Sequence, residues 1–135
     1  MAGTELTVLT LEECVVLLAQ GGLGRLGVSV AAMPEIFPVA FCFSEGDILF
    51  RTGTRTRLHS ATQGTVVAFE IDAYDPDERS GWSVLVTGSC SEEQDPNRIA
   101  DARQRLSEGW VPGDQDHIVR ITPYKISGRR ICQAR

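Results

Sequence analysis

The sequence lacks any apolar run close to the about 20 residues that a membrane-spanning helix needs. Its first 14 residues also lack the basic segment followed by an apolar core that marks a secretory signal. These absences predict a cytoplasmic protein with no membrane partner. Basic residues are scarce, because 13 lysines and arginines face 18 acidic residues, for a net charge of −5 and a pI near 5.0. A chain with this balance is a poor general binder of nucleic acid.

Cysteine and histidine are few and scattered. The cysteines stand alone, with no C-x-x-C pair, at Cys14, Cys42, Cys90 and Cys132. Neither His59 nor His117 has zinc-ligand spacing from a cysteine, or a companion at the spacing of a hydrolytic triad. We therefore expect four buried, reduced thiols, no metal site, and two structural or solvated histidines.

What is present is an ordinary globular composition, with 42% hydrophobic and 23% charged residues in 135 positions. That length predicts one domain over residues 1–135. A domain of this size has little volume for an internal cofactor pocket, and a site between two subunits is easier to build. The small size of the domain therefore favours a homodimer.

Local patterns predict two helices and six strands, with a further short helical stretch ending near Gln63. Thr10 and Glu13 have the spacing of a capping box, which predicts a helix from Leu11 to about Gly21, and Asp95-Pro96 begins a second one. The predicted strands are residues 25–30, 36–43, 48–52, 65–72, 81–88 and 117–129, the last being a strand pair or one bent strand interrupted at Pro123. The first turn is placed at Met33-Pro34, and loops are expected at 73–80 and 109–116. Six strands with short connections indicate a small antiparallel barrel or sandwich with peripheral helices.

Positive charge is concentrated in one segment, since no acidic residue occurs between Asp47 and Glu70. Arg55 and Arg57 lie where a helix is expected to begin, and the helix dipole disfavours a cation there by about 0.3–1 kcal/mol. An anionic ligand would offset that cost. The further donors nearby are Arg51, Thr52, Thr54 and Thr56. The segment predicts either a phosphate site for a small ligand or a solvated surface loop. It matches neither a Walker motif nor a G-x-G-x-x-G turn.

Two other places carry candidate residues. Trp82 and Ser83 begin a strand after a charged loop, where the indole is either plain core or a stacking surface for a ligand. Arg129 follows Gly128 near the C-terminus, where it either closes a site or is solvated.

Six blocks, in their order and spacing, resemble the pyridoxamine 5′-phosphate oxidase-related flavin-binding split barrels, and more narrowly their short actinobacterial-type members. The resemblance covers the chain from about residue 10 to 131. The blocks are Gly24–Val28 (GRLGV), Phe37–Val39 (FPV), Phe50–Thr52 (FRT), Val67–Asp72 (VAFEID), Gly81–Gly88 (GWSVLVTG) and Ile126–Arg129 (ISGR).

The resemblance implies a mainly β (α+β) fold, a six-stranded antiparallel split β-barrel with short peripheral helices. It also implies a homodimer with FMN in two symmetric clefts at the subunit interface. The FMN phosphate would be held by Arg51, Thr52 and Arg57, with Thr56 beside them. The isoalloxazine ring would lie along Val39, Ala40 and Phe41, largely against backbone groups. Trp82 and Ser83 would approach the phosphate region from across the interface, and Arg129 would reach the same cleft.

The sequence departs from that family at two positions. Ala40 replaces an asparagine found in many relatives, which removes a hydrogen bond to the ring edge, and Arg57 replaces the commoner lysine, which keeps the charge. The implied function is a flavin-dependent oxidoreductase acting on a small molecule, with no side chain standing out as catalytic. The alternatives are a deazaflavin (F420)-dependent reductase, a non-catalytic flavin or haem carrier, and a dimeric barrel with an empty cleft.

Overall fold

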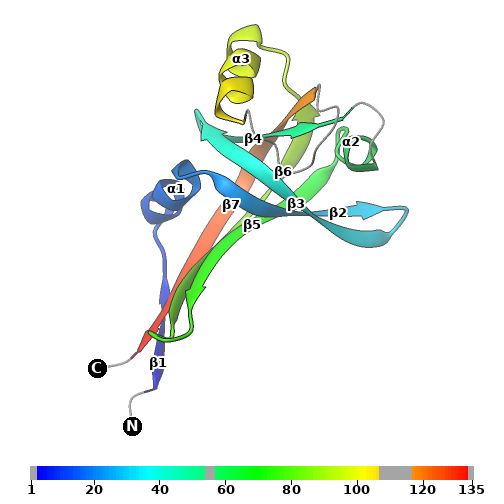
Figure 1. Ribbon diagram of the computed structural model, residues 1–135. Coiled ribbons are helices and arrows are strands. Elements are labelled where there is room, and N and C mark those ends of the chain that lie inside the picture. Colours follow the sequence, from blue (N-terminus) through cyan, green and yellow to red (C-terminus); the bar gives the residue numbers. More distant parts are fainter. Residues whose placement is uncertain (1–2, 54–56, 107–116, 134–135) are drawn as a thin grey trace.

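The fold is a six-stranded barrel with a seventh strand attached outside it (Figure 1). The computed structural model describes residues 3–53, 57–106 and 117–133. In chain order the elements are β1 (Thr4–Val8), α1 (Leu11–Ala19), β2 (Gly22–Val30), β3 (Met33–Ser44), β4 (Asp47–Thr52), α2 (Arg57–Ala61), β5 (Val66–Asp75), β6 (Ser80–Glu92), α3 (Pro96–Arg105) and β7 (His117–Gln133). The strand order is β1-β7-β4-β3-β2-β5-β6, and β6 pairs again with β7, which closes the ring. All described pairings are antiparallel, as expected for the predicted split barrel.

Alternating apolar residues of the strands fill the barrel. In β5, Val67, Phe69 and Ile71 are buried, while their neighbours face outward. The ring of Phe69 packs edge-on against Phe41, with the centroids 4.9 Å apart. It also lies against Gly24, where a Cβ atom would come within 2.3 Å of the ring. A glycine at this position in β2 therefore makes room for the ring of Phe69.

The two longer helices begin where the sequence predicts. The side chain of Thr10 accepts a hydrogen bond from the backbone of Glu13, whose carboxylate accepts one from the backbone of Thr10. Asp95 caps α3 through the backbone N–H of Asn97. The α3 helix buries Ala102 on a second small core formed by Cys42, Leu49, Leu106 and Ile118. This core lies on the outer face of β4, opposite the barrel interior.

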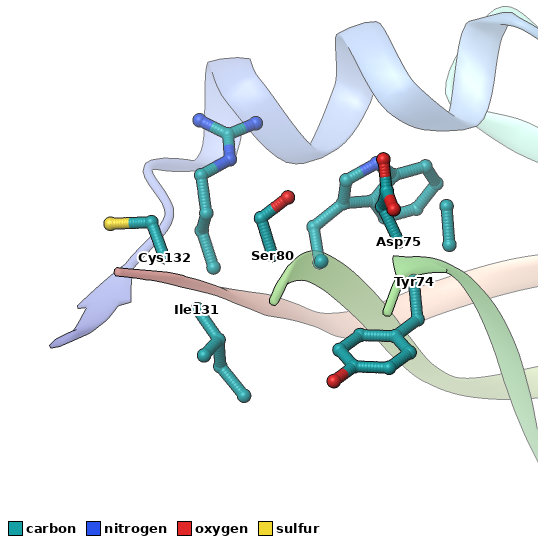
Figure 2. Close-up of a pocket in the computed structure, with 9 residues that line it drawn as sticks. Tyr74, Asp75, Ser80, Ile131 and Cys132 are labelled. Atoms are coloured by element: carbon teal, nitrogen blue, oxygen red, sulfur yellow. The ribbon is translucent and has the colours of Figure 1, made fainter. Parts of the chain in front are cut away.

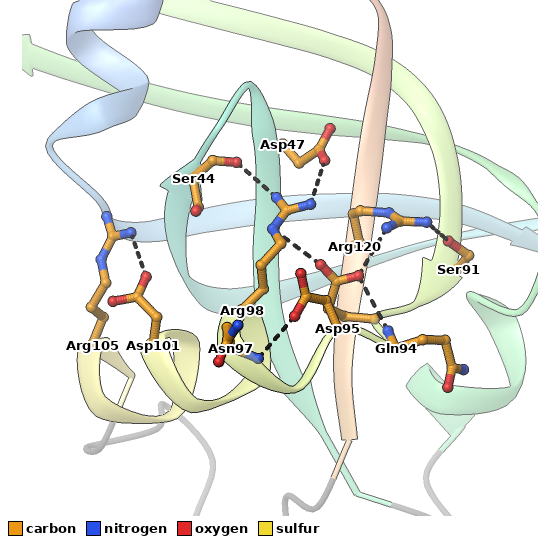
Figure 3. Close-up of polar contacts among 11 residues, drawn as sticks. Ser44, Asp47, Ser91, Gln94, Asp95, Asn97, Arg98, Asp101, Arg105 and Arg120 are labelled. Atoms are coloured by element: carbon orange, nitrogen blue, oxygen red, sulfur yellow. Dashed lines mark hydrogen bonds and ion pairs between the residues drawn. The ribbon is translucent and has the colours of Figure 1, made fainter.

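A buried carboxylate joins α3 to the barrel (Figure 3). Glu93 is 2% exposed and lies between two arginines. One of its oxygens is 3.1 Å from Nε of Arg98, and the other is 2.8 Å from Nη1 of Arg120. Arg98 also donates to Asp47 and to the Ser44 carbonyl, in the turn between β3 and β4. The network therefore fixes three elements that lie far apart in the sequence.

Three boundaries differ from the prediction. The first hairpin turns at Ala31 and Ala32, both at positive φ (50° and 66°), so the predicted turn at Met33-Pro34 is wrong. The predicted loop at 73–80 is shorter than expected. β5 extends to Asp75 and β6 begins at Ser80, so only residues 76–79 form the turn. The last segment is one strand, as in the bent-strand alternative, and its pairing with β6 shifts register where Gly88 faces Pro123.

β1 is an additional strand that the sequence analysis did not predict. All five of its residues are exposed, and it pairs with residues 129–133 of β7. The four cysteines are free, and Cys132 is partly exposed rather than buried as predicted. Within the described ranges, no helix is long and apolar enough to cross a membrane. The predicted loop at 109–116 lies outside the described residues.

Candidate functional site

The end of β4 holds the most distinctive polar group of the fold. Thr52 is 2% exposed and pairs in register with His117 of β7. Because side chains alternate along a strand, Thr52 shares the inner face with Phe50, which is part of the main core. Its hydroxyl is buried and has no hydrogen-bond partner among the described residues. A buried hydroxyl left in this state costs about 1–3 kcal/mol, which a ligand oxygen at this position would recover.

Arg51, the next residue back along β4, lies on the outer face. It pairs in register with Ile118 of the second core, and its Nη1 donates to the carbonyl of Leu106 at 3.3 Å. A guanidinium has five N–H donors in a planar fork, the geometry that suits contact with a phosphate. Thr52 and Arg51 therefore flank the strand end from opposite faces.

The remaining predicted phosphate residues lie at the edge of what the structure describes. Arg57 begins α2, but its side chain is outside the described residues, as are Arg55 and Thr56. Their role in binding stays a prediction. The helical stretch predicted to continue to Gln63 ends at Ala61.

β3 brings the predicted ring-binding residues next to this strand end. The ladder between β3 and β4 ends at the pair Phe41–Phe50, although both strands continue beyond it. Ala40 and Val39 are thus the next β3 residues beside Arg51 and Thr52. Val39 and Phe41 are 4% and 2% exposed and are part of the main core. Contact between the β3 backbone and a flavin ring stays a prediction.

The third predicted group lies at the other end of the molecule. Trp82 and Ser83 pair in register with Arg130 and Arg129 near the end of β7, whereas Thr52 pairs with its first residue. Twelve strand residues at about 3.3 Å each put these two places about 40 Å apart along β7. A single chain therefore does not bring Trp82, Ser83 and Arg129 to Thr52.

That distant end carries a pocket of its own, with a volume of about 340 Å³ (Figure 2). Trp82 and Arg130 line it together with Tyr74, Asp75, Ile131 and Cys132. Ser83 and Arg129, the other predicted residues, are their neighbours in sequence and are not part of this lining. The pocket joins apolar, aromatic and cationic groups at an end of the barrel remote from β4.

The structure also brings together the two histidines, which are 58 residues apart in the sequence. The rings of His59 and His117 lie 4.4 Å apart, and both contact the carboxylate of Glu92. No local spacing signals this cluster, because its members come from α2, β6 and β7.

The closed six-stranded antiparallel ring with peripheral helices is the split-barrel fold of flavin-binding proteins. Comparison with known proteins then identifies the family. The sequence profile of the pyridoxamine 5′-phosphate oxidase family matches residues 10–130, so the chain belongs to that family.

Individual relatives agree with this assignment. An uncharacterized protein of Mycobacterium tuberculosis is 39% identical over 132 residues, which are 94% of this chain and 86% of that protein. The solved structure of an FAD-binding protein from Mycobacterium smegmatis is 33% identical with a TM-score of 0.74, covering 93% of this chain and 98% of that one. An FAD- and haem-binding protein from the same species has a TM-score of 0.70 at 13% identity, over 91% of this chain and 71% of that one, which shows the fold alone.

Proposed function

We propose that this protein is a homodimeric flavin-binding oxidoreductase that acts on a small molecule and holds the flavin phosphate at the end of β4. The observation that carries the proposal is the buried hydroxyl of Thr52, which has no hydrogen-bond partner among residues 3–53, 57–106 and 117–133, at the position where the family resemblance implies a phosphate contact. A phosphate oxygen is an acceptor and a hydroxyl is a donor, so the two groups match.

The flavin is FMN in the first instance, as the sequence implies. The relative from M. smegmatis is an FAD-binding protein, and FAD contains the same riboflavin phosphate unit. A contact between Thr52 and that unit therefore fits both nucleotides. Haem is the alternative cofactor, because a protein of the same fold binds both FAD and haem.

The separation of the two halves of the predicted site supports the proposed homodimer. Trp82 and Ser83 reach a phosphate at Thr52 only if a second chain supplies them, because they lie about 40 Å away along β7. Large apolar side chains on the surface agree with an interface. Those more than 60% exposed include Met33, Ile36, Val66, Tyr74 and Tyr124.

A bound flavin supplies the hydride or electron transfer itself. The protein orients it through the hydroxyl of Thr52, the guanidinium of Arg51 and the backbone of β3. The small side chain of Ala40 leaves the ring edge without a side-chain donor at that position. Recognition of the ring then depends on backbone groups and on burial.

The proposal is tested by titrating the full chain with FMN, FAD and riboflavin and following quenching of flavin fluorescence. FMN should bind at least about tenfold more tightly than riboflavin, because riboflavin lacks the phosphate. Arg51→Ala should weaken FMN binding by about 1.5–3 kcal/mol and leave riboflavin binding nearly unchanged.

Arg79→Gln is the matched control, because Arg79 is an exposed arginine in the turn between β5 and β6. Failure of the wild-type protein to bind any of the three flavins would overturn the proposal. Equal affinities for FMN and riboflavin would overturn the phosphate site. Light scattering of the eluting protein should give the mass of two chains, and a single-chain mass would contradict the dimer.

A further inference from the structure

The cluster of His59, Glu92 and His117 has the composition of a transition-metal site. Nε2 of His59 is 3.4 Å from Oε1 of Glu92, and Nδ1 of His117 is 2.9 Å from the same oxygen. The three candidate ligand atoms all lie within 4.8 Å of one another. Ligands at about 2.0–2.2 Å from a tetrahedral zinc ion are about 3.3 Å apart, so small side-chain rotations suffice to place all three on one ion.

The backbone around the cluster holds its three elements in place. The segment after α2 is tied to β6, because Gly64 donates to the Cys90 carbonyl and Cys90 donates to the Thr65 carbonyl. β6 is in turn paired with β7, with Glu92 in register with Val119. The ligand-bearing residues therefore sit on connected elements and not on separate loops, which lowers the cost of ordering them around an ion.

The side chains of the cluster are partly buried and keep some contact with solvent. His59, Glu92 and His117 keep 18%, 33% and 25% of their side-chain surface exposed. An ion can therefore enter, and three protein ligands leave at least one coordination position for water or another molecule. Such an open position is characteristic of a catalytic rather than a structural zinc site.

The charges of the cluster also suit a cation. Oε1 of Glu92 lies within 3.4 Å of a ring nitrogen of each histidine, so the formal negative charge of the cluster lies beside both rings. The charge of a divalent ion bound by two imidazole nitrogens and this carboxylate would be partly balanced by the carboxylate.

We infer that His59, Glu92 and His117 form a binding site for one divalent transition-metal ion per chain, with an open coordination position. Imidazole and carboxylate ligands favour zinc, iron and their neighbours over magnesium or calcium. None of its three residues belongs to the predicted flavin contacts, but the site adjoins them, because His117 pairs in register with Thr52.

The test uses the full chain without a histidine tag, titrated with Zn²⁺ against a chromophoric chelator of known affinity. One ion per chain should bind. His59→Gln, Glu92→Gln and His117→Gln should each weaken binding at least about tenfold, because even outer-sphere partners of metal ligands are worth roughly 10–100-fold. Matched controls are Glu78→Gln, an exposed carboxylate in the turn after β5, and Cys132→Ser, which removes the partly exposed thiol. Both should bind Zn²⁺ like the wild type.

Histidine NMR gives a readout that does not depend on the variants. The chain has only two histidines, so the ring ¹⁵N signals of both should shift on addition of one equivalent of Zn²⁺. Absence of saturable binding would overturn the inference. Binding that survives His59→Gln and Glu92→Gln, or that is lost in Cys132→Ser, would overturn it equally.

Discussion

Replacing Thr52 by valine should have opposite effects on the stability of the ligand-free protein and on its affinity for flavin. Valine keeps the branched shape of threonine and removes only the hydroxyl. Thr52 is 2% exposed and its hydroxyl has no partner among the described residues. The wild-type protein without ligand therefore carries the cost of a buried, unsatisfied donor.

The substitution should increase the stability of the ligand-free protein and decrease its affinity for FMN. Relief of the unsatisfied hydroxyl should stabilise the ligand-free Thr52→Val protein by about 1–3 kcal/mol. For a domain of this length each kcal/mol corresponds to about 3–4 °C in Tm. Loss of a hydrogen bond to a charged phosphate should weaken FMN binding by about 1.5–3 kcal/mol, which is roughly a 10- to 150-fold rise in Kd.

Thr62→Val is the matched control. Thr62 is also buried, at 0% exposure, but its hydroxyl donates to the carbonyls of Leu58 and His59 at 3.0 and 3.2 Å. Its removal should destabilise the protein by about 0.5–1.5 kcal/mol. Urea denaturation of the ligand-free proteins measures the first effect, and flavin fluorescence measures the second. A Thr52→Val protein that is less stable than wild type and binds FMN equally well would refute the reasoning.

Two further predictions concern the rest of the fold. Glu93→Gln should destabilise the protein by about 3 kcal/mol in urea, because it leaves Arg98 and Arg120 without their buried carboxylate, whereas Asp101→Asn, which breaks an exposed ion pair, should cost less than about 0.5 kcal/mol. An equal effect of the two changes would contradict the role given to the buried network. Burial raises the pKa of Cys90 to about 12, so roughly one thiol in a thousand is ionised at pH 9. Since unfolding returns that pKa to about 9, the free energy of unfolding should fall as pH rises above 9. Alkylation of the native protein at pH 8.5 should modify the partly exposed Cys132 first. Early modification of Cys90 would contradict this.

Local signals in the sequence were enough for most elements. The capping box at Thr10 and Glu13 and the proline after Asp95 each act within one helical turn, and both helices begin as predicted. The turn at Ala31 and Ala32 was missed because neither alanine signals a positive φ, which the two long paired strands impose. β1 was missed because none of its side chains is buried, so its position depends on pairing with a strand more than 120 residues later.

The candidate sites also contain residues that the sequence predicts and residues that only the fold brings together. Thr52 was predicted from the segment without acidic residues and from the resemblance, but its burial is a property of the folded barrel, in which β4 pairs with β7 at Thr52 and His117. The cluster of His59, Glu92 and His117 was beyond sequence reasoning, which gave each histidine a structural or solvated role. Its members are 33 and 25 residues apart, so only the folded barrel brings them together.

The most direct test of the phosphate site is a crystal structure of the full chain grown with FMN. We expect two chains with a flavin in each interface cleft, and a phosphate oxygen within hydrogen-bond distance of the Thr52 hydroxyl. A flavin bound with its phosphate away from the end of β4, and with the hydroxyl of Thr52 still unpartnered, would contradict it.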